Sequence, residues 1–243
     1  MKVLELDSGN TRLKWRVLDN GQVVARGDIA NTENWSAGFR RFSQALSKVE
    51  QARASVVSGS YRAESLSFMV KQYWAVNLDI VKIRPQWRGL VLDYDNPMKL
   101  GVDRWLAMLA ACEQIKQGTR IVVDSGTALT IDLVNGSGQH LGGYIVPGQG
   151  LMKDSLLVNT ANLGKSGDPI RSIEPGKKTI DCINQGILAM SAALVNAQVE
   201  RFPDAQVVIT GGDAPQLQPY IKAQCQYVSE LVMDGLALSL RED

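Results

Sequence analysis

Two stretches of this sequence share one pattern: KVLELDSGNTRLKWRVLDNG at residues 2–21 and RIVVDSGTALTIDLVNG at residues 120–136. Each begins with an apolar run that predicts a strand, passes through Asp-Ser-Gly, and returns as a second apolar run that ends at an Asn-Gly turn. Matching strands, tripeptide and hairpin indicate an internal duplication. Coincidence is the alternative, since Asp-Ser-Gly is a common turn sequence.

Around these two hairpins, expected helices alternate with expected strands. The strands are expected at residues 2–7, 13–18, 23–25, 56–57, 78–83, 120–124, 129–134, 140–146 and 206–210. The helices are expected at residues 34–49, 64–74, 103–116, 150–159, 179–202 and 232–240. Residues 84–100 are expected to form a loop, and the polar stretch 160–178 to be mobile. The alternation predicts an α/β protein with mixed sheets, in two related halves at residues 1–117 and 118–243.

Composition excludes several classes of function. The 243 residues carry a formal net charge of +1, so a broad interaction with nucleic acid or a membrane surface is not expected. No apolar run long enough to span a bilayer is expected, and the start reaches Glu5 and Asp7 at once, unlike a signal peptide. Three scattered cysteines, Cys112, Cys182 and Cys225, favour free thiols and a cytoplasmic location.

The chain has one histidine, His140, so a multi-histidine metal site is excluded and a Ser-His-Asp triad would depend on that residue. His140 begins the alternating segment HLGGYIV, which is typical of a strand face rather than of a catalytic base. Proton transfer is therefore expected to fall to a carboxylate.

The first Asp-Ser-Gly motif, DSGNTRLK at residues 7–14, has the residue types of a phosphate-binding loop. Gly9 lets the backbone approach an anion, and neighbouring amides and hydroxyls can donate to phosphate oxygens. Lys14 adds positive charge, and Asp7 could hold Mg²⁺ directly or through water. An ordinary β-turn with a surface lysine is the alternative.

The second motif, DSGTALTID at residues 124–132, repeats this chemistry after a buried strand. Asp124 ends that apolar strand, where a carboxylate needs a partner that a cation could supply. A third motif, TGGD at residues 210–213, could let a flat ring or a ribose approach closely, although strand-Gly-Gly-helix junctions are common in proteins.

The fourth motif, GVDRW at residues 101–105, lies at an expected helix start. Asp103 could simply be the N-cap, since aspartate is favoured there. Arg104 fits that place less well, because the helix N-terminus already carries partial positive charge. The pair suits a site that takes a proton from a hydroxyl and binds a substrate anion.

Together with GGYIVPG at residues 142–148, these motifs resemble, in order and over essentially the whole chain, the type III pantothenate kinases. That family belongs to the superfamily of sugar kinases, actin and chaperone ATPases. The resemblance implies two ribonuclease H-like domains with the nucleotide in the cleft between them. It also implies ATP-dependent phosphorylation of pantothenate to 4'-phosphopantothenate, the first step of coenzyme A biosynthesis, and a homodimer.

The resemblance also implies a role for individual residues. The residues expected to contact ATP are Asp7, Ser8, Gly9, Asn10, Thr11, Arg12, Leu13, Lys14, Thr127, Gly211 and Gly212. Those expected to contact pantothenate are Tyr94, Gly101, Val102, Asp103, Arg104 and, across the dimer, Thr179, for which a helix-cap role stays open. Asp103 is the expected general base. Asp124 is the expected ligand of a monovalent cation, K⁺ or NH₄⁺, and Mg²⁺ is expected to accompany ATP.

Two alternatives stay open. One is a kinase of the same superfamily that acts on a sugar or another small alcohol, against which the GVDRW segment argues. The other is an ATP-binding regulator without enzyme activity, since the family includes members first described as accessory factors for transcription. Asp103 and the two phosphate loops favour catalysis.

Overall fold

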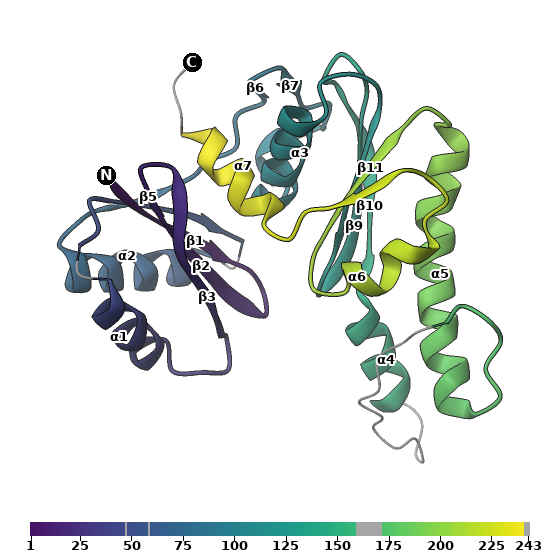
Figure 1. The fold of residues 1–243 in the computed structure, drawn as a ribbon, viewed down its shortest axis with the longest axis horizontal. Coiled ribbons are helices and arrows are strands. Elements are labelled where there is room, and N and C mark those ends of the chain that lie inside the picture. Colours follow the sequence, from purple (N-terminus) through teal and green to yellow (C-terminus); the bar gives the residue numbers. More distant parts are fainter. Residues whose placement is uncertain (47, 58, 159–171, 241–243) are drawn as a thin grey trace. The chain divides into compact units, whose positions relative to one another are not determined.

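The computed structural model describes residues 1–46, 48–57, 59–158 and 172–240 (Figure 1). These residues form two compact units. Unit 1 comprises Met1–Arg84, Met98–Ala110 and Val232–Asp243, and unit 2 comprises Pro85–Pro97 and Ala111–Leu231. The division differs from the expected boundary after residue 117, because Pro85–Pro97 packs with the second half and the C-terminal helix packs with the first.

Unit 1 is built on a mixed five-stranded sheet with the strand order β3-β2-β1-β4-β5. Its strands are β1 (Lys2–Ser8), β2 (Arg12–Asp19), β3 (Gln22–Ala30), β4 (Gln51–Val56) and β5 (Leu78–Ile80). Its helices are α1 (Trp35–Ala45), α2 (Ser60–Trp74), the first part of α3 (Val102–Gln114) and α7 (Leu231–Ser239), with the 3₁₀ turn η1 (Pro97–Lys99).

Unit 2 contains a second mixed five-stranded sheet with the strand order β10-β9-β8-β11-β12. Its strands are β8 (Arg120–Ser125), β9 (Ala128–Val134), β10 (His140–Pro147), β11 (Gln206–Thr210) and β12 (Cys225–Tyr227). The remaining elements are the small hairpin β6 (Gln86–Trp87) and β7 (Leu90–Val91), the helices α4 (Gln149–Val158), α5 (Thr179–Arg201) and α6 (Ala214–Leu217), and the 3₁₀ turn η2 (Gln218–Tyr220).

The two sheets confirm the predicted duplication. In each, two antiparallel hairpin strands follow the central strand on one side, and two parallel strands lie on the other. Both central strands end in Asp-Ser, at Asp7 and at Asp124. The α/β class with mixed sheets and the duplicated halves are therefore as predicted.

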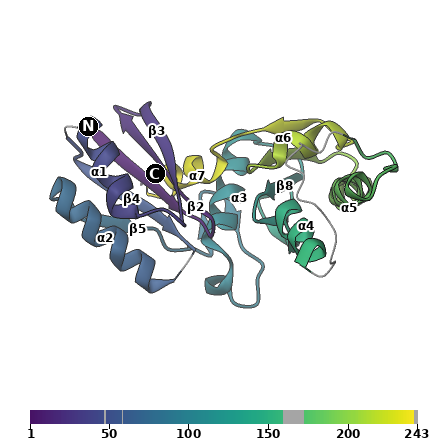
Figure 2. The same ribbon diagram turned by 90° about the horizontal axis from the view of Figure 1, so that it is seen from below.

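The two faces of the unit 1 sheet differ in what covers them. Helices α1 and α2 lie on one face (Figure 1, Figure 2), where Phe39 and Leu66 pack against Leu4 and Leu6 of β1. Because side chains alternate along a strand, Glu5 and Asp7 point to the opposite face. The polar end of β1 is thus separated from the α1–α2 layer by the sheet.

Several expected elements have different limits in the structure. Helix α1 ends at Ala45 rather than residue 49, and β4 begins at Gln51, five residues before the strand expected at 56–57. The expected loop 84–100 contains β6, β7 and η1, while α6 and β12 were not anticipated. The stretch 160–178 lies outside the described residues as far as residue 171.

Helix α5 corrects one expectation. By length and composition it is the one helix in the described part of the chain that could span a membrane, although no such run was expected. Four of its side chains, Leu188, Ala192, Val195 and Val199, lie in the hydrophobic core of unit 2. Burial against the sheet accounts for the apolar face of this helix.

Candidate functional site

The first phosphate-loop motif forms the turn between β1 and β2. The Gly9 amide donates to the Arg12 carbonyl at 3.1 Å, which closes the turn. From the end of β3, the Asn31 side-chain amide donates to the carbonyls of Gly9 at 3.0 Å and Asn10 at 2.7 Å. The sequence did not single out Asn31, whose contacts hold the carbonyls of this loop.

The side chains of this motif divide between the core and the solvent. Ser8 and Leu13 are fully buried, so a contact of Leu13 with nucleotide would fall to its backbone. Asn10, Thr11, Arg12 and Lys14 are exposed, and Arg12 pairs with Asp28 of β3. The solvent-facing part of the loop therefore carries the amide, hydroxyl and basic groups that phosphate binding requires.

Asp7 lies at the centre of a charged cluster in unit 1. Strand register places Lys14 of β2 opposite it on one side and Ser55 of β4 on the other. Burial raises the pKa of Asp7 from 3.8 to about 6. Lys14 and the Ser55 hydroxyl oppose that rise, and the nearby charge of Asp103 adds to it. Asp7 and Asp103, 96 residues apart in the sequence, are thus electrostatic neighbours.

Ser55 was missed because β4 was expected to begin at residue 56. The alternation of Ala52, Ala54 and Val56 would have revealed it, since that pattern puts Arg53 and Ser55 on the other face of the strand.

Asp103 lies in the first turn of α3, which begins at Val102, so it is not the N-cap residue. Its Oδ1 accepts the backbone N–H of Arg104 at 2.8 Å. A Cβ on Gly101 would lie 2.5 Å from the same oxygen, so the glycine gives the carboxylate room. Arg104 is itself buried, with 7% of its surface exposed. The motif thus fixes one carboxylate oxygen of Asp103.

Unit 2 brings its glycine motifs together at the second Asp-Ser-Gly turn. The Asp213 amide donates to the Ser125 carbonyl at 2.9 Å, and a Cβ on Gly211 would lie 2.3 Å from that oxygen. The Gly148 amide donates to the Thr127 carbonyl at 2.9 Å. The segments DSGTALTID, GGYIVPG and TGGD, predicted separately, therefore form one structural site.

Uncharged hydroxyl residues flank Asp124 on the neighbouring strands, namely Thr130 on β9 and Thr210 on β11. Burial raises the pKa of Asp213, whose carboxyl follows the Gly-Gly turn. Thr127 is exposed. Among the described residues no group of three or more His, Cys, Asp or Glu side chains could hold a metal. A cation at Asp124 would therefore also need hydroxyl, carbonyl, water or phosphate oxygens.

The two remaining expected substrate residues belong to unit 2. Tyr94 is 37% exposed, and its ring stacks on His140 with 6.3 Å between centroids. Thr179 is exposed and is the first residue of α5, whose N-cap is Lys178, so the helix-cap alternative for Thr179 is wrong. The expected strand position of His140 is confirmed: it is fully buried at the start of β10, and its Nε2 lies 3.0 Å from Asp132 Oδ1.

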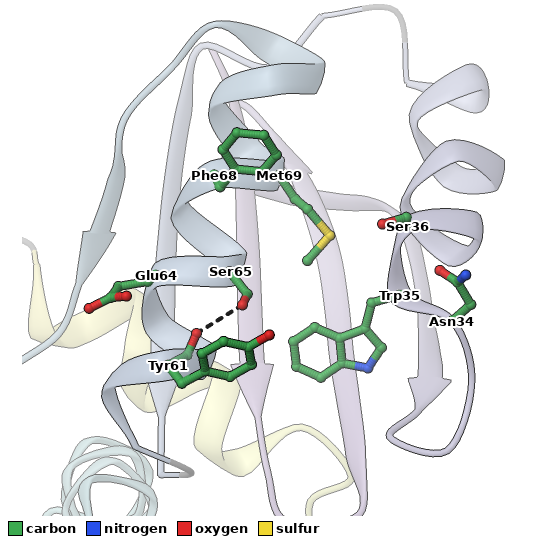
Figure 3. Close-up of a pocket in the computed structure, with 8 residues that line it drawn as sticks. All are labelled: Asn34, Trp35, Ser36, Tyr61, Glu64, Ser65, Phe68 and Met69. Atoms are coloured by element: carbon green, nitrogen blue, oxygen red, sulfur yellow. Dashed lines mark hydrogen bonds between the residues drawn. The ribbon is translucent and has the colours of Figure 1, made fainter.

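A cavity of about 470 Å³ lies elsewhere, between α1 and α2 (Figure 3). Its lining contains Trp35, Tyr61 and Phe68 but none of the predicted site residues. The sheet separates it from Asp7, as described above. Arg62 connects the cavity with the first Asp-Ser-Gly loop. Its guanidinium lies over the ring of the cavity residue Trp35 and donates to the Gly9 carbonyl at 3.4 Å.

Comparisons with known proteins agree with the arrangement of these motifs. A family profile described as type III pantothenate kinase matches residues 3–201. A type III pantothenate kinase of Hahella chejuensis is 37% identical over 241 residues, covering 98% of this chain and 97% of the relative. One of Nitrosococcus oceani is 30% identical over 249 residues, covering 97% and 92%.

Solved structures support the fold. A conserved putative Baf family transcriptional activator from Campylobacter jejuni has a TM-score of 0.64 and 22% identity, covering 98% of this chain and 96% of that one. The ethanolamine utilization protein EutJ from Carboxydothermus hydrogenoformans has a TM-score of 0.55 and 12% identity, covering 98% and 89%. The family profile and the full-length relatives together show that the chain belongs to the type III pantothenate kinase family, which phosphorylates pantothenate in coenzyme A biosynthesis.

Proposed function

We propose that the chain transfers the γ-phosphoryl group of ATP to the primary hydroxyl of pantothenate, with Asp103 as the general base. The observation that carries this proposal is the cluster in unit 1, where Asp103 lies in the electrostatic neighbourhood of the phosphate-loop residue Asp7. Phosphoryl transfer depends mainly on alignment and charge neutralisation, so a base beside a phosphate site suits it.

Both Asp-Ser-Gly loops would bind the phosphates. In the first, the exposed amides and hydroxyls and Lys14 would donate to phosphate oxygens. Mg²⁺ fits Asp7, directly or through water, because a buried carboxylate with a raised pKa gains most from a nearby cation. In the second loop, Thr127, Gly211 and Gly212 would contact the nucleotide.

A monovalent cation, K⁺ or NH₄⁺, fits Asp124 because the residues flanking this carboxylate, Thr130 and Thr210, offer oxygen donors and no competing positive charge. Such a cation would add charge stabilisation at the second loop. Activity should therefore be higher in K⁺ than in Na⁺ buffer.

Asp103 would accept the hydroxyl proton through its carboxylate, which the Arg104 N–H orients. Arg104, with Tyr94, Gly101 and Val102, would bind pantothenate, whose carboxylate suits a guanidinium. We predict that Asp103→Asn lowers kcat by roughly 10²- to 10⁴-fold, the usual contribution of general-base catalysis, while ATP binding persists. Near-normal turnover would remove Asp103 from the base role.

The experiment that tests the function is ADP release with and without pantothenate, in K⁺ buffer with Mg²⁺. Pantothenate-dependent release is expected. ATP binding without release would favour a regulatory role, and faster release with a sugar or another small alcohol would favour a different acceptor.

We also propose a homodimer, with Thr179 of the partner subunit near pantothenate. Unit 2 exposes large apolar side chains on β10, α4 and α5, where Ile145 is 60%, Leu151 48% and Met190 56% exposed. Contiguous exposed apolar side chains mark subunit interfaces, and these three residues are the candidates for one in unit 2. Light scattering that finds an active monomer would contradict this assignment.

A further inference from the structure

The segment Pro85–Pro97, which carries Tyr94, is attached to the β9–β10 turn by successive contacts. The Val91 amide donates to the Gly138 carbonyl at 2.9 Å, and Val91 forms a parallel bridge with Gln139. The Gln139 side-chain amide donates to Asp93 Oδ2 at 3.5 Å, and the Tyr94 ring stacks on His140 with 23° between the ring planes. The two segments thus lie side by side from Val91 to Tyr94.

Gly138 permits this attachment for two reasons. Its φ of +87° is a conformation that side chains disfavour. A Cβ at this position would also lie 1.9 Å from the Gly89 carbonyl, at the turn between β6 and β7. Any other residue at 138 must therefore push the Tyr94 segment away from the turn.

His140 supplies the surface on which Tyr94 rests. The histidine is fully buried and Asp132 is 2% exposed, and their 3.0 Å contact fixes the orientation of the ring. The other ring nitrogen, Nδ1, has no hydrogen-bond partner among the described residues. Burying an unpartnered ring nitrogen is costly, so the aromatic contact with Tyr94 offers a reason for a histidine at this position.

We propose that Gly138 and His140 are positioning residues that hold Tyr94 in place for pantothenate. This inference rests on the proposed function, because it requires Tyr94 to contact the substrate. A platform that holds Tyr94 equally in the ground state and the transition state affects pantothenate binding and leaves the chemical step unchanged. Its signature is a raised KM for pantothenate with little change in kcat or in the KM for ATP.

The matched test compares Gly138→Ala with Gly136→Ala in the same turn. A Cβ on Gly136 would meet its nearest atom at 3.6 Å, an ordinary contact. Gly138→Ala should raise the pantothenate KM by roughly five- to tenfold, the factor expected from losing an aromatic contact, and Gly136→Ala should not. Equal effects of the two variants, or a parallel rise in the ATP KM, would overturn the proposal.

His140→Gln provides a second route if Gly138→Ala fails to fold. Glutamine keeps an N–H donor for Asp132 but removes the ring beneath Tyr94, so the same selective rise in pantothenate KM is expected. An unchanged KM would contradict the role of His140.

The final arm adds Tyr94→Ala, alone and combined with His140→Gln. If His140 acts through Tyr94, its substitution has little further effect once Tyr94 is truncated, whereas additive effects would overturn the proposal. A Tyr94→Ala protein with normal pantothenate KM would also overturn it, and would place the failure in the Tyr94 assignment. Absence of pantothenate-dependent ADP release in the unaltered protein would instead mark failure of the proposed function.

Discussion

The two sheets share their strand order but differ in the side chains at the middle of the central strand. In unit 1 the buried carboxylate of Glu5 on the central strand accepts hydrogen bonds from Arg16 and Arg53 on its two neighbours. The equivalent central position in unit 2, where β8 pairs with β9 and β11, is Val122. The two halves thus share their topology, but this central-strand position holds a buried, paired carboxylate in unit 1 and an apolar side chain in unit 2.

That network also involves the C-terminal helix. Arg16 donates to Asp234 of α7 at 2.8 Å, and a Cβ on Gly235 would lie 2.0 Å from the Leu106 carbonyl of α3. Because a buried charge without its partners is strongly destabilising, Glu5 and Arg16 help to fix α7 on unit 1. This explains why the last helix of the chain packs with its first half.

The two Asp-Ser-Gly loops also differ in the residues that lie beside their aspartates on the neighbouring strands. Asp7 has Lys14 and Ser55 beside it, whereas the corresponding strand positions next to Asp124 hold Thr130 and Thr210. A lysine therefore lies beside the carboxylate of the first loop, whereas the two strand neighbours of Asp124 are neutral hydroxyl residues. This difference is the physical reason for proposing that an external monovalent cation serves the second loop alone.

Among the changes that test this comparison of the two loops, the removal of Lys14 should have the largest effect. Lys14→Ala should lower kcat/KM for ATP roughly 100-fold, as losing one charge-stabilising donor typically does. Lys48→Ala, which changes a lysine side chain of the same unit that is 73% exposed, is the control and should stay near the unaltered value. Steady-state kinetics would measure kcat/KM for ATP in both variants. Equal values would mean that Lys14 does not contact the phosphates.

Introducing a lysine beside Asp124, as the first loop has beside Asp7, should have a smaller effect. Thr130→Lys would put an ammonium beside Asp124, in the place that Lys14 has beside Asp7. We expect stimulation by K⁺ over Na⁺, on the order of tenfold for about 1.4 kcal/mol of charge stabilisation, to disappear in this variant. Full K⁺ stimulation in Thr130→Lys would place the cation elsewhere.

The smallest effect concerns stability and pH. The pKa of Asp7 is raised from 3.8 to about 6, so between these values the folded chain holds a proton that the unfolded chain releases. The free energy of unfolding should therefore fall as pH rises through this window, by up to about 1.4 kcal/mol per pH unit from this group. Asp7→Asn should remove that slope in the nucleotide-free protein.

Asp79→Asn, at an exposed position of β5, is the matched control for that experiment. Denaturant unfolding across pH 4 to 7 would show the slope in the control and not in Asp7→Asn. An identical pH dependence in both variants would mean that Asp7 is not desolvated as the structure indicates.

Much of the fold followed from local pattern. The two hairpins combine strand alternation with Asn-Gly turns, and β11 has the limits that the apolar run 206–210 predicted. The early part of β4 was missed because Gln51 and Arg53 are polar on a strand whose other face is apolar. The partner that makes Arg53 compatible with burial, Glu5, is 48 residues away and leaves no local signal.

The candidate site shows the same limit. The motifs named the loop residues, but Asn31 and Ser55 reach the first loop through sheet register, which depends on pairing between distant strands. The packing of Gly211 on Ser125 and of Gly138 on Gly89 likewise depends on where separate segments meet. Motif spacing predicts which residues of one segment act together, whereas tertiary contacts determine which separate segments meet.

We propose that the two Asp-Ser-Gly loops, one from each half of the duplication, both contribute to the binding of a single ATP. Calorimetric titration of the full chain with MgATP, for the unaltered protein and for Lys14→Ala and Thr127→Ala, tests it most directly. One ATP per chain is predicted, with binding weakened by each substitution although the two residues belong to different units. Two ATP molecules per chain, or one molecule whose affinity responds to only one of the loops, would contradict the account.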